Sequence, residues 1–361
     1  MKVPLQQSFL SRLTLAIPNC LPLRHSSYGY FLIILFVLWF SLFALNLSLG
    51  SVNIPLNQVL AIIFQQDTSN QIQTQEIWRD IIWQLRFPRA IAATFAGAAL
   101  GISGIQMQTL FNNPLAGPFV LGINSGAGLG VALVILGTGF LGGAISNFSI
   151  AFAASVGAIA VLSLVLAISH RIPQNTTLLI LGLMLGYVSN SLVTLLLHFS
   201  SSEAIRLYLS WTFGSFAQIQ GEQLPIFTML IGVGVMIAFF SAKALNALLL
   251  GKQYAQSLGL DLRQTRRQII VSTAILSGTV TAFCGPISFI GLAVPHLCRG
   301  LLKTVNHRLL LPAIALLGSS VALLADIIAQ LPGSQLTLPL NTVTALFGAP
   351  IVIAIILRRQ R

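Results

Sequence analysis

Residue types that carry chemistry are sparse in this sequence of 361 residues. The pair Gly251-Lys252 is followed by Gln253 and lacks the upstream glycine that a phosphate-binding loop requires. The sequence also contains no His/Glu metal motif, no G-x-S-x-G nucleophile elbow and no Cys-x-x-Cys pair. We therefore expect a protein that is not an enzyme and binds no cofactor directly. Energy for any active transport must come from an ion gradient or from a partner protein.

Asp326 is the one acidic or basic residue well inside an apolar run, and His198 and His296 fall near the ends of such runs. Ionisable groups inside a membrane are costly and usually functional, so a direct role in binding an ion is one interpretation of Asp326. Proton relays usually need several titratable groups. We therefore favour a hydrogen-bonded carboxyl group that helps helices to pack.

These few residues must be positioned by an apolar framework, because 55% of the chain is hydrophobic and only 7% is charged. A soluble domain usually carries about 25% charged residues, so a large soluble enzyme is excluded. Apolar runs of spanning length predict an all-α polytopic membrane protein with about ten transmembrane helices. The predicted spans are 31–49, 90–110, 119–137, 146–168, 177–198, 224–242, 268–284, 287–302, 309–330 and 341–357.

One pair of these spans admits two interpretations. Gly285-Pro286 separates 268–284 from 287–302, and Pro295 lies inside the second run. The pair is either two spans or one span followed by a break and a half-helix.

Orientation follows from the distribution of basic residues. If the N-terminus is cytoplasmic and all ten spans cross, 15 of the 19 Lys and Arg residues lie on the cytoplasmic side. This asymmetry is the one expected of cytoplasmic loops and places both termini in the cytoplasm. We interpret 1–30 as a cytoplasmic N-terminal segment and 31–361 as a single transmembrane domain. Because no A-x-A cleavage site follows the first apolar run, we expect a retained anchor rather than a cleaved signal peptide.

Two glycine series predict how the helices pack. Gly97, Gly101 and Gly104 lie in one span, and Gly122, Gly126 and Gly130 repeat the small-residue spacing at the next. Small residues at such spacing let helices approach closely, so both series predict a tightly packed bundle and carry no functional assignment.

A series of motifs then appears in order along the chain. It comprises Leu85-Arg86-Phe87-Pro88-Arg89, Gly97-Ala98-Ala99-Leu100, Asn113-Pro114-Leu115-Ala116, Ser257-Leu258-Gly259, Gly291-Leu292-Ala293-Val294-Pro295-His296, Asn306-His307-Arg308 and Ala325-Asp326. This series resembles the FecCD permeases, which are membrane subunits of ATP-binding-cassette (ABC) importers for ferric siderophores, haem and vitamin B12. The resemblance runs from about residue 30 to the C-terminus.

The resemblance implies the ABC type II importer permease fold and a set of partners. These are a second permease subunit (identical or paralogous), two ABC ATPase subunits that carry ATP and Mg, and a substrate-binding protein on the outer side. It further implies a multi-pass protein of the cytoplasmic (inner) membrane of a bacterium. No nucleic acid is expected as a partner, since the positive charge follows the cytoplasmic loops.

The resemblance also assigns site residues. Arg86 and Arg89 occupy positions that dock the binding protein, and snorkelling or a lipid headgroup contact is the alternative for them. Asn113, Leu115, Thr176 and Thr177 occupy the inner gate, although turn and N-cap chemistry would explain the threonines as well.

The inner segment 243–267 is the implied ATPase-coupling element, with Gln256, Leu258 and Gly259 at its core. Gly259 is expected to end a helix in a left-handed turn. The alternative for this segment is a basic loop held against anionic headgroups.

The resemblance leaves the substrate open. A ferric siderophore is the expected substrate because most relatives handle one, with vitamin B12 and haem as alternatives. An ion-coupled secondary transporter is the competing class of function. It would move substrate under a proton gradient without any ATPase.

Overall fold

The chain was analysed as a computed structural model, which describes residues 25–64, 72–137, 146–169, 175–219, 221–332 and 337–359. These residues form helices joined by short connections, and no strand occurs among them. Most of the predicted segment 1–30, including its basic residues, lies outside the described residues. The longer helices are α2 (His25–Ser48), α5 (Phe87–Leu110), α8 (Asn147–Ser169), α9 (Asn175–His198), α11 (Leu224–Phe240), α14 (Leu262–Cys284), α16 (His307–Ala329) and α17 (Leu340–Arg359).

The remaining helices are shorter. They are α3 (Leu56–Ile63), α4 (Ile72–Asp80), α6 (Ile123–Ile135), α10 (Ser202–Thr212), α12 (Ala242–Leu249), α13 (Lys252–Ser257) and α15 (Ile290–Leu302), with a π-helix η1 (Ile81–Arg86) and 3₁₀ turns η2 (Pro118–Leu121) and η3 (Phe216–Gln218).

Each predicted span contains a helix, but the helices differ in their capacity to cross a membrane. Within the described residues six are long and apolar enough, or seven if α11 and α12, bent by 48°, count as one span. Helices α6 and α15, and the apolar part of α17 (Leu340–Ala354), are shorter than these spans. The structure therefore supports a polytopic membrane protein, while ten crossings and the orientation of the termini stay predictions.

The geometry of 268–302 matches the second interpretation, one helix of spanning length followed by a break and a shorter helix. Between α14 and α15 the chain turns through Gly285 (φ 75°) and Phe289 (φ 68°). The turn is fixed from outside, because the Ser288 amide donates to Asn341 Oδ1 at 3.1 Å. With only 13 residues and Pro295 inside it, α15 is shorter than a full crossing of about 20 residues.

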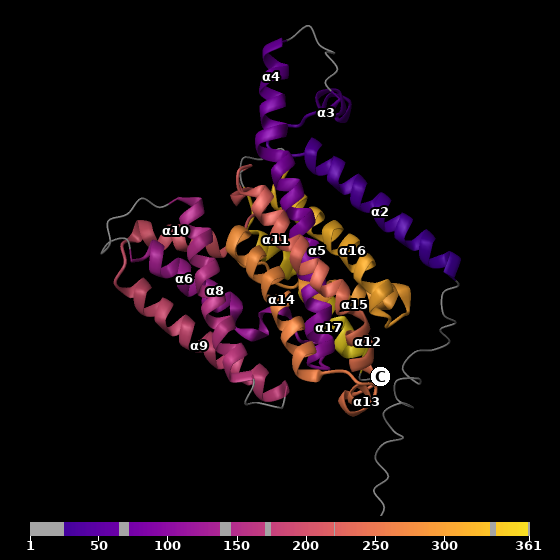
Figure 1. The fold of residues 1–361 in the computed structure, drawn as a ribbon. Coiled ribbons are helices and arrows are strands. Elements are labelled where there is room, and N and C mark those ends of the chain that lie inside the picture. Colours follow the sequence, from indigo (N-terminus) through magenta and orange to yellow (C-terminus); the bar gives the residue numbers. More distant parts are fainter. Residues whose placement is uncertain are drawn as a thin grey trace, which may run out of the picture.

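Helix α5 continues upstream through η1 into α4, so that Glu76–Leu110 is one helical unit of 35 residues. At 1.5 Å per residue such a unit measures about 52 Å, well beyond a hydrocarbon core of about 30 Å. Figure 1 shows the excess, because α4 and α3 project above the rest of the molecule. We call this the α4 end, and the opposite end, where α13 lies, the α13 end.

The glycine series in α5 fits its predicted packing role. A Cβ at Gly97 would overlap the carbonyl oxygen of Gly318 in α16, and one at Gly104 would overlap the carbonyl oxygen of Gly291 in α15. Helix α5 is thus in backbone contact with both neighbours, as small-residue spacing predicts.

The second glycine series joins α6 to α8. Cβ atoms at Gly126 and Gly130 would meet the carbonyl oxygens of Gly157 and Ala153. Helices α6, α8 and α9 share one hydrophobic core with part of α14. Helices α2, α5, α15 and α16 share the other, together with the remaining part of α14. Helix α14, 78% of whose apolar window is buried, therefore lies between the two groups.

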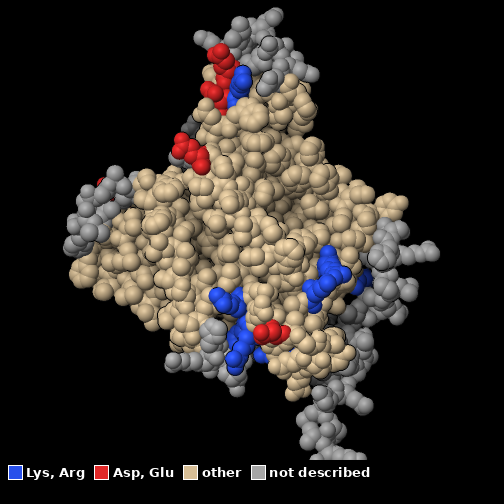
Figure 2. All heavy atoms as spheres, in the orientation of Figure 1, with Lys and Arg blue, Asp and Glu red and all other residues tan. Residues whose placement is uncertain are grey.

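Charge separates along the long axis on the face shown in Figure 2. Acidic side chains gather at the α4 end, whereas Lys and Arg gather toward the α13 end. The separation agrees with the charge distribution predicted from the sequence.

Candidate functional site

The charged motif residues of the α4 end form a buried polar cluster around Asp326. The Arg89 guanidinium donates to both Asp326 oxygens through Nε (3.0 and 2.9 Å) and through Nη2 (2.8 Å). Asn46 Nδ2 donates to Asp326 Oδ2 at 2.9 Å, and Gln330 Nε2 donates to the same oxygen at 2.8 Å. The Asp326 side chain is 1% exposed and that of Arg89 is 18% exposed. The cluster joins α2, α5 and α16, which is the packing role favoured for Asp326 from the sequence.

Arg86 lies beside this cluster and is bound to the end of α2. Its Nη1 donates to the carbonyl oxygens of Leu47 (2.7 Å) and Ser48 (2.8 Å), and its Nη2 donates to that of Val52. The residue is 7% exposed. Three carbonyl acceptors satisfy much of a guanidinium, which has five donors.

The two predicted docking arginines are therefore brought together but turned inward. Each guanidinium is held by acceptors of this chain, which contrasts with the exposed pair that the sequence suggested. Docking of a binding protein through Arg86 and Arg89 stays a prediction, and it would require these contacts to exchange. The sequence motif gave their position along the helix but could not give the direction of their side chains.

The predicted coupling segment forms two short helices, α12 and α13, at the α13 end (Figure 1). Helix α13 ends as expected in a left-handed turn at Gly259, with φ 83°. The Leu260 amide donates to the Ala255 carbonyl (3.1 Å) and the Gly259 amide to the Gln256 carbonyl (2.9 Å). These two bonds define a Schellman motif, which explains glycine at this position.

Three apolar side chains of this segment are exposed. Leu250, Tyr254 and Leu258 are 62%, 54% and 61% exposed. Gln256 is exposed beside them, whereas Ala255 is buried and anchors α13 to the bundle. An exposed apolar set rimmed by polar residues is typical of a protein–protein contact.

The predicted gate residues Asn113 and Leu115 lie in the turn that follows α5. Asn113 Oδ1 accepts the Leu115 amide at 2.9 Å, and the Leu115 side chain is 44% exposed. His296 of α15 holds the same turn by donating from Nε2 to the Pro114 carbonyl at 2.8 Å. The Asn113 contact is an Asx turn, so part of the residue's role is structural.

Thr176 and Thr177 lie in the first turn of α9, and both are exposed. Helix α9 meets the α5–α6 connection further along, where a Cβ at Gly182 would overlap the Val120 carbonyl. Helix α9, which carries the two predicted gate threonines, is thus in contact through Gly182 with the connection that contains the Asn113 turn. Their gate role stays a prediction.

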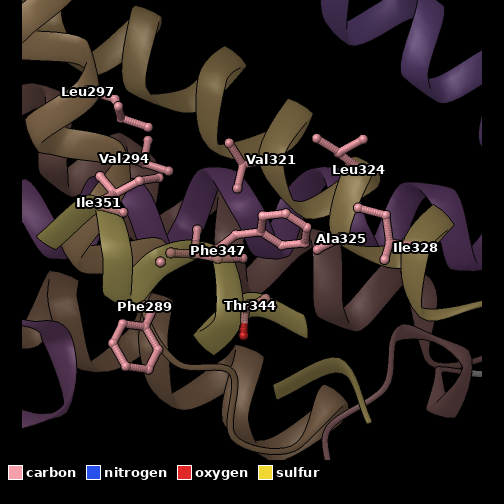
Figure 3. A pocket seen from close by; sticks show the side chains of 13 residues that line it. Phe289, Val294, Leu297, Val321, Leu324, Ala325, Ile328, Thr344, Phe347 and Ile351 are labelled. Atoms are coloured by element: carbon pink, nitrogen blue, oxygen red, sulfur yellow. The ribbon is translucent and has the colours of Figure 1, made fainter. Parts of the chain in front are cut away.

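A hollow of about 470 Å³ lies between α15, α16 and α17. Figure 3 shows Phe347 reaching toward α16, with aliphatic side chains of α15 and α16 around it. Thr344 is the one polar side chain of the lining, and its hydroxyl donates to the Asn341 carbonyl. The hollow therefore offers apolar contact and no free polar group, so a charged chelate gains no hydrogen bond there.

Sequence reasoning missed a polar cluster at the α13 end, formed by Asn246, His307 and Thr109. His307 Nδ1 lies 2.8 Å from Asn246 Oδ1, and Nε2 lies 2.9 Å from Thr109 Oγ1. The available signal was the polar pair Asn306-His307 directly before an apolar run, which was noted only as part of a motif. Nothing in the sequence pairs it with Asn246, about 60 residues away.

The FecCD transport family matches residues 34–358. The chain belongs to the FecCD family. It is a membrane permease subunit of the ABC importer class, as the resemblance implied, and it is a multi-pass membrane protein.

Relatives of this chain in several bacteria share one name with each other. The vitamin B12 import system permease protein BtuC of Salmonella arizonae is 39% identical over 281 residues, covering 78% of this chain and 84% of that protein. BtuC of Escherichia coli O9:H4 gives the same identity and coverage.

Two solved structures resemble the FecCD chain in fold. One is described as an inward-facing conformation of a putative metal-chelate type ABC transporter, with a TM-score of 0.77, 29% identity and coverage of 91% of this chain and 99% of that one. The other, PsaBC from Streptococcus pneumoniae in complex with Fab, has a TM-score of 0.50 at 14% identity and shows the fold alone. The type II importer permease fold is thereby confirmed.

Proposed function

We propose that this FecCD protein is the permease subunit of an importer for a large metal chelate in a bacterial cytoplasmic membrane. Vitamin B12 is the substrate to test first. The observation that supports it is the 39% identity to vitamin B12 permeases over 84% of their length. A ferric siderophore, the substrate expected from the sequence, belongs to the same chemical class and is the competing substrate. Haem is the third.

Selectivity among these chelates is proposed to lie in the binding protein rather than in this chain. The hollow between α15, α16 and α17 has no free polar side-chain group with which to recognise one chelate over another. Among the described residues no group of three His, Cys, Asp or Glu side chains could hold a metal ion. A permease with such a lining would accept what the binding protein delivers.

The power source is proposed to be a separate ATPase that docks on α12 and α13. Support comes from the exposed apolar side chains of Leu250, Tyr254 and Leu258 on a segment that α11 holds through a 48° bend. Burying such side chains against a partner is favourable at about 25 cal/mol per Å² of apolar surface. A basic loop held on lipid headgroups would not need them.

Uptake by cells tests the substrate. A strain that lacks the gene for this chain is compared with the same strain carrying it, using radiolabelled cyanocobalamin, a labelled ferric siderophore and haem. Uptake of cobalamin that depends on the chain supports the proposal. Uptake of the siderophore alone would identify a ferric siderophore as the substrate. Uptake of none of the three contradicts transport of this chelate class.

Cysteine accessibility tests the gate. We propose that the Asn113 turn and the start of α9 move when ATP is hydrolysed. Cysteines at positions 113 and 176 should therefore change their rate of reaction with a thiol reagent when ATP is added to the complete complex. Cys284 and Cys298 are buried and give a low background, and Cys20 is replaced by serine in the starting protein. Equal rates with and without ATP would remove both residues from the gate.

A further inference from the structure

The cluster at the α13 end is a continuous chain of side-chain hydrogen bonds across three helices. Asn246 lies on α12, His307 begins α16 and Thr109 lies in the last turn of α5. His307 is fully buried and Thr109 is 6% exposed. A buried polar chain of this kind is costly unless each member is satisfied, so its geometry fixes the relative positions of the three helices.

The donors and acceptors admit one arrangement for a neutral His307. The Asn246 side-chain oxygen is an acceptor, so His307 Nδ1 must carry the proton and donate to it. The His307 backbone amide donates to the same oxygen at 2.8 Å. Nε2 is then the acceptor, and the single Thr109 hydroxyl proton is donated to it in place of the Ile105 carbonyl oxygen, which lies 2.9 Å from the same Thr109 oxygen. The Asn246 amide nitrogen donates to Asn306 Oδ1 at 2.9 Å, and this oxygen also caps α16.

The two ends of this series of hydrogen bonds adjoin elements that are proposed to move. At one end, Leu250 and Gly251 join α12 directly to α13, which carries the exposed apolar surface proposed for the ATPase. At the other end, α5 stops one residue after Thr109 at Leu110, and Asn112 turns the chain with φ 48° into the Asn113–Leu115 turn. That turn is also held by His296 through the Pro114 carbonyl.

We infer that Asn246, His307 and Thr109 act as a relay that transmits movement of the α12–α13 segment to the gate turn after α5. The inference rests on the proposed function, because it assumes an ATPase on α13 and a gate at Asn113. A displacement of α12 must carry the first turn of α16 with it, since both the backbone and the ring of His307 bind one Asn246 oxygen. The same ring then pulls on the last turn of α5. The three residues are positioning residues and do not contact the substrate.

The test compares transport with ATP hydrolysis in the reconstituted importer. The full complex is placed in proteoliposomes with its binding protein, and substrate imported per ATP hydrolysed is measured. Asn246→Ala removes the acceptor of His307, and Thr109→Val removes the hydroxyl with little change of shape. Coupling between two sites typically amounts to 5–150-fold, so each variant should lower substrate per ATP by roughly fivefold or more while ATP hydrolysis continues.

Conservative and control variants separate a relay from a role in folding. Thr109→Ser keeps the hydroxyl, so it should retain coupling. Thr281→Val is the matched control, because this buried threonine donates only within α14, to the Ser277 carbonyl. The double variant Asn246→Ala/Thr109→Val should import as much substrate per ATP as the more severely affected single variant, because both substitutions interrupt the same series of hydrogen bonds.

Three results would overturn the relay. The first is an unchanged ratio of substrate to ATP in both single variants. The second is additive losses in the double variant. The third is failure of both single variants to assemble with the ATPase, since the cluster would then only hold the fold. In each case the unmodified complex still imports substrate, whereas its failure to do so would contradict the proposed function instead.

Discussion

The two ends of the molecule treat their motif residues in opposite ways. At the α4 end Arg86 and Arg89 are directed inward and donate to carbonyl and carboxylate oxygens of this chain. At the α13 end Leu250, Tyr254 and Leu258 are directed outward, each more than half exposed. The charged residues are thus part of the framework, and the apolar residues are the free surface.

The different directions of these side chains follow from the surroundings of the two sets of residues. Arg86 and Arg89 lie on a helix that α2 and α16 cover, so their charge is stabilised only if acceptors are supplied within the protein. The residues of the α13 end lie on short helices broken at Gly251 and Gly259, both with positive φ. Between these breaks α13 is too short to bury more than Ala255. A surface free for a partner is therefore found on a short segment that is interrupted at both ends.

The largest effect is expected from Asp326→Ala at the α4 end. The variant leaves the Arg89 guanidinium without its carboxylate and removes the acceptor of Asn46 and Gln330. Breaking a buried ion pair from one side costs about 3 kcal/mol of unfolding free energy. Unfolding in detergent measures it, with Glu76→Ala, which removes an exposed carboxylate of the same end, as the control. Undiminished stability would mean that Arg89 is free to dock a partner, and the contrast between the ends would fail.

The next largest effect is expected at the contact between α5 and α15. Gly104→Ala places a methyl group on the Gly291 carbonyl and should cost about 2 kcal/mol through overpacking. Gly232→Ala in α11 is the matched control, because nothing lies within 4 Å of its Cβ position. Both free energies come from the same unfolding measurement. Equal stability of the two variants would show that α5 and α15 are not in backbone contact.

A smaller effect, confined to binding, is expected from Leu258→Glu at the α13 end. The side chain is 61% exposed, so the free energy of unfolding should change by no more than about 0.5 kcal/mol. Affinity for the ATPase should fall at least tenfold, or about 1.4 kcal/mol, because a charge enters an apolar contact. Titration of purified permease with the ATPase measures this. Val305→Glu, at an apolar residue that is 58% exposed outside the segment, should bind normally. An equal loss in both variants would point to a general effect of charge.

The smallest effect is expected from Gly259→Ala. A side chain at φ 83° is strained, at a cost of about 1 kcal/mol, although no neighbour crowds the position. Affinity for the ATPase should decline by a few-fold, because α13 loses its end and Leu258 its fixed direction. Gly300→Ala, in the interior of α15 with nothing within 4 Å, is the control. A fully active Gly259→Ala variant would show that the Schellman turn does not orient the docking surface.

Much of this fold could be predicted, because the relevant physics is local. Apolar runs predicted where helices occur, the spacing of Gly97, Gly101 and Gly104 predicted close helix packing, and Gly259 predicted a left-handed turn. Each of these features depends on residues within one or two helical turns of each other. Local sequence therefore predicted where the helices lie and how α13 ends.

The candidate site was predicted less completely, because its contacts join distant parts of the chain. Asp326 is 237 residues from Arg89 and 280 from Asn46, and His307 is 198 from Thr109. No periodicity within one helix encodes such pairs. The motif around Arg86 and Arg89 therefore predicted a location. The inward direction of Arg86 depended on Leu47 and Ser48 at the end of another helix, and that of Arg89 on Asp326.

The most direct test of the whole account is the energy source of transport. Purified permease, its ATPase and its binding protein are reconstituted in liposomes, and import of labelled cobalamin is measured with ATP, without ATP, and with a proton gradient alone. The account predicts import that requires both ATP and the ATPase subunits and that Leu258→Glu reduces. Import driven by the proton gradient in liposomes that contain only this chain would contradict it and would identify an ion-coupled carrier instead.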